Sequence, residues 1–126
     1  MRPNPAFQRV IDEYTPHIQE LAIDTRIFLF ETLPDLNEDV DESGNVIDYT
    51  LSTDHKGLIC TMDLSKAGVK LGFYNGADLP DPDKILAGSA LKYRYVEIND
   101  LAFLRSSILK DLILESSKAI KYSNKI

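Results

Sequence analysis

The chain has 126 residues, of which 44% are hydrophobic and 27% charged, and its formal net charge is -6 at pH 7. These values are those of one globular domain, residues 1–126, and the acidic surface disfavours nucleic acid as a partner. The single cysteine excludes an internal disulfide. No stretch approaches the ~20 apolar residues of a membrane span, and the first residues lack the apolar run of a signal peptide. We therefore expect a cytoplasmic protein with no membrane partner.

Two helices are predicted in the first third of the chain. Asn4-Pro5 and Thr15-Pro16 each combine a capping side chain with a proline at the first helical position. The second helix extends from Pro16 to about Leu33. It carries a broad apolar stripe, a polar line of Glu20, Asp24 and Glu31, and a second apolar stripe formed by Ile23, Ile27 and Phe30. Such a helix is either enclosed by core on both sides, which we favour, or uses one side for a partner.

Alternating and apolar runs predict a sheet in the middle of the chain. Four runs, 46–51, 58–62, 69–74 and 91–98, have strand character, and the second is apolar on both faces like an interior strand. Short links favour antiparallel pairing. A short helical turn capped by Asp81 or Asp83 precedes the last run, and Asn99-Asp100 caps a long C-terminal helix. We predict an α+β two-layer sandwich, in which an antiparallel sheet of about five strands packs against N-terminal and C-terminal helices.

Residues 68–98 also carry a motif, formed by Val69, Leu71, Phe73, Gly76, Leu79, Asp81-Pro82, Leu86, Gly88 and Arg94-Tyr95-Val96. In this motif the chain resembles the YdhG-like family of small bacterial domains. The resemblance extends more weakly to both flanks, through Arg26, Phe28-Leu29, Pro34 and Glu38 and through the last helix. It implies a frataxin-like α+β fold and, for some members, the handling of iron. It implies no catalytic residue.

The chain departs from the family pattern at two places. Gly88-Ser89-Ala90-Leu91 stands where the family commonly has Gly-Thr-Gly-Lys, so an anion site there is not expected. Glu42-Ser43-Gly44-Asn45 stands where the family often has an aromatic-Gly-Met-Pro segment, so a pocket built by that segment is not expected either.

The densest charge in the chain offers candidate metal ligands, namely Glu31, Asp35, Glu38, Asp39, Asp41 and Glu42. Carboxylate oxygens suit hard cations and iron, so this acidic segment is a candidate for weak iron binding. A solvated face is the commoner role of such charge runs. Iron is the one cofactor that the chain suggests.

A second candidate site combines aromatic rings with one cation. Tyr74, Tyr93, Arg94 and Tyr95 lie near the two ends of the motif and are candidates to line a cleft for a small anionic ligand. Cross-strand pairing on a half-exposed sheet face is the favoured alternative.

Catalytic patterns are missing from the sequence. His17 and His55 have no partner at metal-site spacing, and Cys60 lies in an apolar run where a buried, inert thiol is expected. Asp78, Asp81 and Asp83 lack the glycine and glutamate of a calcium loop. A binding role is therefore favoured over an enzymatic one.

Three functions stay open. The first is a binding domain whose acidic face takes iron or a basic protein partner. The second is a small-ligand pocket protein, as a monomer or a homodimer. The third is an interaction scaffold. Exposure of Phe103, of Leu114 or of the stripe formed by Ile23, Ile27 and Phe30 would favour this third function.

Overall fold

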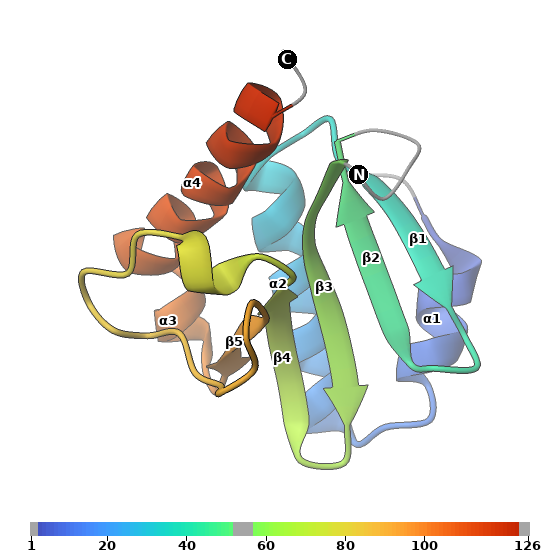
Figure 1. The fold of residues 1–126 in the computed structure, drawn as a ribbon. Helices are drawn as coiled ribbons and strands as arrows, with labels where there is room; N and C mark the ends of the chain where they lie inside the picture. Colours follow the sequence, from blue (N-terminus) through green and yellow to red (C-terminus); the bar gives the residue numbers. More distant parts are fainter. Residues whose placement is uncertain (1–2, 52–56, 124–126) are drawn as a thin grey trace.

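The chain forms a five-stranded antiparallel sheet with helices before and after it (Figure 1). The computed structural model describes residues 3–51 and 57–123, with the backbone alone for residues 121–123. The turn residues 53–56, including His55, lie outside the described residues. The elements are α1 (Pro5–Ile11), α2 (Pro16–Thr32), β1 (Asn37–Asp41), β2 (Val46–Thr50), β3 (Leu58–Ser65), β4 (Gly68–Phe73), the short 3-10 helix η2 (Gly76–Asp78), β5 (Arg94–Ile98), α3 (Leu101–Leu104) and α4 (Ser107–Ser123).

The first two helices begin where the proline pairs predict. The Asn4 side chain accepts hydrogen bonds from the backbone N–H groups of Ala6 and Phe7 at 3.1 and 3.3 Å. Thr15 Oγ1 accepts one from Ile18 N–H at 3.4 Å. These caps satisfy N–H groups that have no partner within the helix.

The sheet follows the chain, in the order β1-β2-β3-β4-β5, and every neighbouring pair is antiparallel. One cross-strand row passes through all five strands on the face that the helices cover, and it consists of Val40, Ile47, Met62, Leu71 and Val96. Because strand side chains alternate, this row joins its neighbours to form one apolar face. The predicted two-layer α+β sandwich with a five-stranded antiparallel sheet is confirmed.

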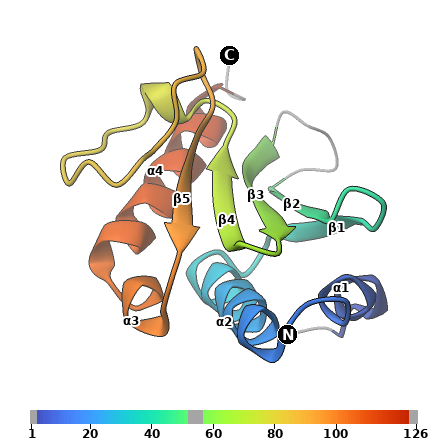
Figure 2. The same ribbon diagram turned by 90° about the horizontal axis from the view of Figure 1, so that it is seen from below.

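The helices close this apolar face from the two ends of the sequence. Figure 2 shows α1 and α2 lying side by side under the sheet, and α3 and α4 on the side of β5. The buried side chains of all four helices join one core, which includes Phe7, Leu29, Leu104 and Leu109. Ser116 of α4 ties the last helix to β3, because its Oγ donates to the Ile59 carbonyl at 2.9 Å.

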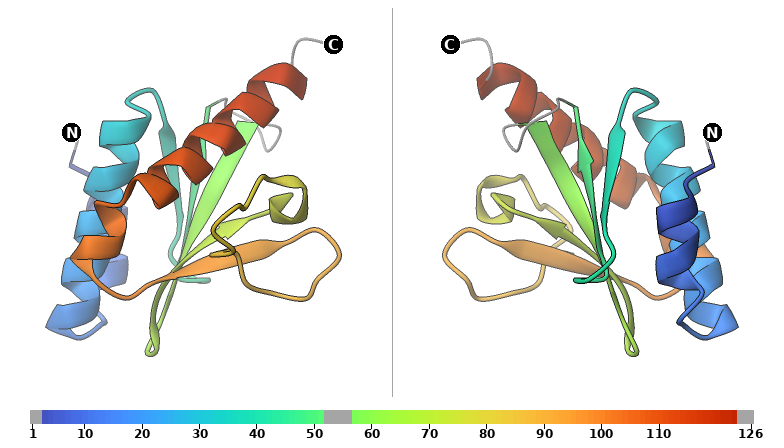
Figure 3. Two further views of the ribbon diagram at one scale, coloured as in Figure 1. Left: turned by 90° about the vertical axis from the view of Figure 1, so that its left-hand side faces the viewer. Right: turned by 90° about the vertical axis from the view of Figure 1, so that its right-hand side faces the viewer.

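The opposite face of the sheet carries polar side chains. One cross-strand row there consists of Asp39, Asp48, Thr61, Gly72 and Tyr95. The β4–β5 connection, residues 74–93, extends away on this side, opposite α1 and α2 (Figure 3). It also touches the outer edge of β5, where Ala87 and Tyr95 exchange both backbone hydrogen bonds at 2.8 and 3.0 Å.

Four local expectations need correction. The acidic segment contains a strand, β1, because its alternation places Glu38 and Val40 on the covered face. The C-terminal helix is interrupted at Arg105-Ser106, where the Ser106 hydroxyl donates to the Phe103 carbonyl at 2.7 Å and competes with the helical pattern.

The other two corrections concern the β4–β5 connection. The predicted helical turn is an irregular turn, although Asp81 does cap it by accepting from the N–H groups of Ile85 and Leu86 at 2.9 and 3.0 Å. The last strand begins at Arg94 rather than at residue 91, and Leu91 is 90% exposed.

Candidate functional site

A buried ion pair lies where α2 meets β1. The Arg26 guanidinium donates from Nε to Oε2 of Glu38 at 2.7 Å and from Nη2 to Oε1 at 2.8 Å. Only 11% of the Arg26 side chain and 5% of the Glu38 side chain are exposed. Two further donors reach Glu38, the Tyr49 hydroxyl at 2.7 Å and Asn4 Nδ2 at 2.9 Å. This Glu38 network therefore joins the start of α1, α2, β1 and β2.

Aromatic rings enclose the cation of this network. The Arg26 guanidinium lies 5.2 Å from the ring centre of Phe7 and 5.4 Å from that of Phe30. Phe30 in turn meets Tyr49 edge to face, with ring centres 6.0 Å apart. Cation–π contacts and shielding from water strengthen the ion pair.

The network fixes the charge of Glu38. Burial raises the pKa of Glu38, but the hydrogen bonds from Arg26, Tyr49 and Asn4 and the charge of Arg26 lower it by more, so the net shift is downward. The hydrogen bond to Glu38 raises the pKa of Arg26. Glu38 is thus an anion already neutralised by its own cation, and it is not available as a metal ligand without breaking this pair.

The other candidate metal ligands are spread over the surface. Glu42 pairs with Arg9 at 2.5 Å. Asp41 accepts from the Ser43 hydroxyl at 2.7 Å and from backbone N–H groups, and these bonds lower its pKa. Glu31, Asp35 and Asp39 make no hydrogen bond or ion pair with a described residue. Within residues 3–51 and 57–123, no three Asp, Glu, His or Cys side chains are grouped to hold a metal ion. Iron binding by this segment stays a prediction.

The structure separates the four residues of the predicted ligand cleft. Tyr93 and Tyr95 lie on the polar face of the sheet with ring centres 6.3 Å apart, and Lys70 Nζ lies 4.7 Å from the ring centre of Tyr95. Tyr74 is 68% exposed. The Arg94 guanidinium donates to the carbonyls of Ala90 and Tyr93 in its own loop.

Cross-strand contact describes Tyr95, which meets Lys70 of β4, but not Tyr74 or Arg94. None of the three cavities described below is lined by any of them. A ligand cleft formed by Tyr74, Tyr93, Arg94 and Tyr95 stays a prediction for which the geometry gives no support.

The outer face of α2 is open, in contrast to the enclosed arrangement that we favoured. Leu21, Ala22, Thr25 and Leu29 are buried beneath the sheet, whereas Ile23 is 39% exposed and Ile27 is half-buried. Phe30 is half-buried because its ring covers Arg26 and Tyr49. We call the line of Ile23, Ile27 and Phe30 the α2 ridge.

A groove lies on each side of the α2 ridge. One, of about 990 Å³, lies between α2, the start of the described chain and β1, and its walls include Asn4, Phe30, Pro34 and Asp35. The other, of about 500 Å³, lies between α2 and the α3–α4 corner, and its walls include Asp24, Phe28, Leu104 and Lys110. Ile27 and Glu31 line both grooves, so the two hollows adjoin at the ridge.

Acidic side chains rim the α2 ridge. Glu20, Asp24 and Glu31 lie beside Ile23 and Ile27 on the helix surface, as expected from their spacing. None of these three carboxylates makes a hydrogen bond or ion pair with a described residue. The surface therefore combines exposed apolar area with unpaired negative charge, and two cations, Arg105 and Lys110, line the smaller groove on the side of the α3–α4 corner.

Cys60 offers no alternative chemistry. It is fully buried, and burial raises the pKa of its thiol far above the ordinary value, so it stays protonated and unreactive at neutral pH. The expectation that the Cys60 thiol is buried is confirmed.

Sequence reasoning missed the Glu38 network. Arg26 lies between the two apolar stripes of α2, and a cation at such a position, with Phe30 one helical turn later, was the available signal. Its partner follows 12 residues later across a turn, and only the packing of β1 against α2 brings the two together.

Comparisons with other proteins do not extend this description. None of the helices within the described residues has the length and apolar character needed to cross a bilayer. The chain matches no protein-family model, no curated protein and no solved structure, so the similarity to the YdhG-like family stays a prediction.

Proposed function

We propose that the domain is a protein-binding module that receives a basic amphipathic helix on the α2 ridge. The observation that carries this proposal is the partial exposure of Ile23 and Ile27 between two adjoining grooves, on the outer side of a helix whose other side is buried. An exposed apolar strip with polar borders marks an interaction surface in soluble proteins. Grooves beside such a strip accept the apolar side chains of a partner helix at i, i+3, i+4 and i+7.

The charge around the ridge selects the partner. Glu20, Asp24 and Glu31 project next to the apolar strip, and Asp35 lies in the wall of the larger groove. A partner with lysine or arginine beside its apolar face pairs with these carboxylates, whereas an acidic partner is repelled. A second copy of the chain brings the same carboxylates and a net charge of -6, so self-association through the ridge is disfavoured.

The dimensions of the surface suit a helix of moderate length. α2 has 17 residues, which corresponds to about 25 Å at the usual rise of an α-helix. A partner of four or five turns spans the ridge and both grooves. The Glu38 network holds the wall of the larger groove in place, because Asn4, Arg26 and Glu38 all line it.

The proposal is tested with a designed peptide of 18 residues that places leucine on one helical face and lysine on the other. We expect saturable binding by calorimetry, with amide shifts in residues 20–36 and 101–110. Ile27→Ser removes apolar area from the centre of the ridge and is expected to weaken binding about tenfold. Leu91→Ser is the matched control, because it removes an exposed apolar side chain from a distant loop.

Charge is tested separately from shape. Glu31→Gln is expected to weaken binding and to reduce its salt dependence, whereas Glu97→Gln, on the opposite face of the sheet, is not. A peptide of the same composition without an apolar face should bind weakly. Equal binding of both peptides, or unchanged affinity in Ile27→Ser, would refute the proposal. A dimer of the free domain that Ile27→Ser disrupts would assign the ridge to a second copy instead.

A further inference from the structure

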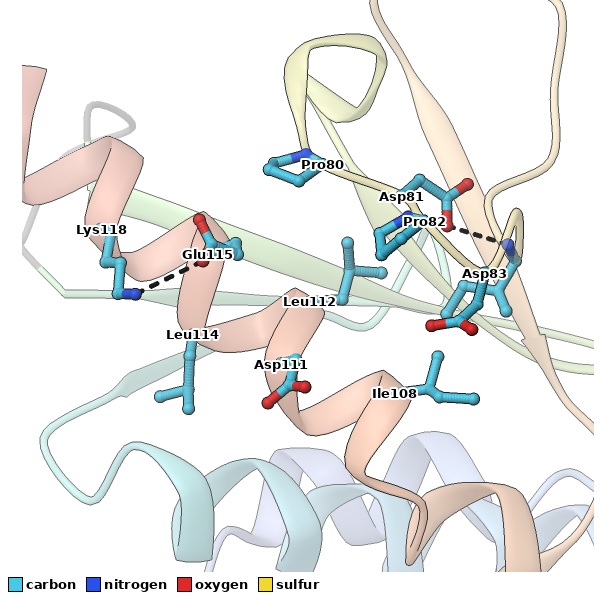
Figure 4. A pocket seen from close by; sticks show the side chains of 11 residues that line it. Pro80, Asp81, Pro82, Asp83, Ile108, Asp111, Leu112, Leu114, Glu115 and Lys118 are labelled. Carbon is cyan, nitrogen blue, oxygen red and sulfur yellow. Dashed lines mark hydrogen bonds and ion pairs between the residues drawn. The ribbon is translucent and has the colours of Figure 1, made fainter.

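A third cavity, of about 270 Å³, lies on the other side of α4, away from the α2 ridge (Figure 4). Its walls come from the β4–β5 connection and from one side of α4, and none of its lining residues lines the two grooves beside α2. Its volume is slightly below the ~300–1,000 Å³ of common ligand sites, which suits a small molecule rather than a peptide. This observation is independent of the proposed function.

The cavity has an apolar interior. Ile85 of the loop and Ile108, Leu112 and Leu114 of α4 line it, and Figure 4 shows Ile108 and Leu112 on the side of α4 that is turned toward the loop. Leu112 is buried, whereas Ile108 is among the exposed large apolar residues of the chain. A short aliphatic group placed here removes apolar surface from water on both partners.

The loop wall is preformed. Pro80 and Pro82 restrict the backbone on either side of Asp81, whose carboxylate accepts from the N–H groups of Ile85 and Leu86 at 2.9 and 3.0 Å. Asp81 is therefore turned toward its own loop, as Figure 4 shows, and supplies rigidity rather than a free charge. A preformed wall reduces the entropy that binding costs.

Two carboxylates at the rim have no partner among the described residues. Asp83 comes from the loop and Asp111 from α4, and Figure 4 shows the Asp83 carboxylate turned toward the side of α4 that carries Ile108 and Asp111. Glu115 is occupied by Lys118 at 3.4 Å, and that ammonium is the one cation in the lining. An apolar interior with spare negative charge on two opposing walls complements a cation on an aliphatic chain.

We propose that this cavity binds a small aliphatic amine. The ammonium lies between Asp83 and Asp111, and the hydrocarbon chain packs against Ile85, Ile108 and Leu112. A carboxylate-bearing ligand of the same shape is rejected, because it meets two anions of like sign. An alcohol of the same shape binds more weakly, because it gains the apolar contact without the charge.

The test compares three probes of equal chain length, hexylamine, hexanol and hexanoate, by titration of the amide spectrum of the whole chain. We expect hexylamine to give saturable shifts in residues 80–86 and 108–118, hexanol smaller ones, and hexanoate none. Asp111→Asn is expected to weaken hexylamine binding about threefold, and the Asp83→Asn, Asp111→Asn pair about tenfold. Both aspartates are exposed at the rim, so these variants keep the fold.

Asp63→Asn is the matched control, because Asp63 is an exposed aspartate on the far part of β3 and is not part of the cavity. It is expected to leave hexylamine binding unchanged. Equal binding of hexylamine and hexanol, shifts that spread over the acidic surface without saturation, or equal effects of Asp63→Asn and Asp111→Asn would each overturn the proposal.

Discussion

Glu38 shows how one residue organises this domain. Its carboxylate receives donors from α1, α2 and β2 while it lies itself on β1, so four segments meet at one charge. The ion pair is shielded from water, and removal of one partner leaves the other as an uncompensated buried charge. The pair therefore matters more for which segments come together than for its own net contribution to stability.

Glu38→Gln is expected to lower the free energy of unfolding by about 3–5 kcal/mol, because it removes the carboxylate that neutralises the buried Arg26 cation. The double variant Arg26→Met, Glu38→Gln is expected to lose less stability than Glu38→Gln alone, since it also removes the buried positive charge. Urea unfolding measures both. The exposed pair of Arg9 and Glu42 is the control, and Glu42→Gln should have little effect. A double variant less stable than either single variant would contradict this account.

At the scale of elements, two glycines allow close packing around the β4–β5 connection. Gly72 of β4 lies against Tyr93, and Gly76 of η2 lies against Arg94 at the start of β5. A Cβ built at Gly72 lies 2.7 Å from Cε2 of Tyr93, whose ring covers this strand position. A Cβ built at Gly76 lies 2.6 Å from Cβ of Arg94 and 3.0 Å from its backbone nitrogen. The first neighbour is the end of a movable side chain, and the second is backbone of β5.

Gly76→Ala is therefore expected to cost more stability than Gly72→Ala. Overpacking against backbone that cannot move costs about 1–3 kcal/mol, and we expect Gly76→Ala to fall in this range. Gly72→Ala should cost less, because Tyr93 can turn into solvent. Adding Tyr93→Ala should remove most of the effect of Gly72→Ala and none of that of Gly76→Ala. Thermal unfolding of these four variants and of Tyr93→Ala alone measures these differences, and equal losses of stability at the two glycines would contradict this explanation.

The α2 ridge shows the limit of prediction at this scale. The two stripes and the polar line of α2 were evident from spacing, and the caps at Asn4 and Thr15 fixed where the first helices begin. Whether Ile23 and Ile27 are covered depends on how many layers the fold has. The periodicity of a single helix gives no information about the number of layers. The sheet has helices on one face, and the outer side of α2 stays open.

At the scale of the molecule, acidic pH is expected to unfold the domain through its carboxylates. The pKa of Glu38 and that of Asp41 are both lowered in the folded state. Between the folded and unfolded pKa values the unfolded chain binds more protons, so stability rises with pH in that window. The contribution of Glu38 is thus complete above its ordinary value of 4.5 and is lost as pH falls below it toward the folded value.

Tyr49→Phe tests this dependence. It removes one of the hydrogen bonds that lower the pKa of Glu38, so the loss of stability between pH 6 and pH 3 should be smaller in the variant than in the natural protein. Urea midpoints across this range give the comparison, with Tyr93→Phe as a control for the loss of a hydroxyl elsewhere. Parallel plots of urea midpoint against pH for Tyr49→Phe and the natural protein would show that Glu38 does not determine the loss of stability at acidic pH.

The fold was more predictable than the sites for a physical reason. Local signals, such as Asn4-Pro5 and the alternation in Val46–Thr50, determine where elements begin and which face is apolar. Strand β1 was not predicted because most of its residues are carboxylates, so no apolar alternation is visible. Glu38 is buried in an ion pair at a position where an apolar residue is usual. The grooves and the amine cavity arise between segments far apart in sequence, such as Ile85 and Ile108, and no local pattern encodes their distance.

The pairing of Ala87 with Tyr95 has a consequence for assembly. It occupies the first part of the outer edge of β5, at the second residue of this strand, so β1 has the more open outer edge of the two edge strands described. Growth of a fibre by strand addition requires two open edges on each molecule, whereas one open edge permits only a closed pair. Asp39 and Asp41 on β1 oppose even this pair by repulsion. The topology thus limits polymerisation geometrically, and the charge of the edge acts as a second barrier.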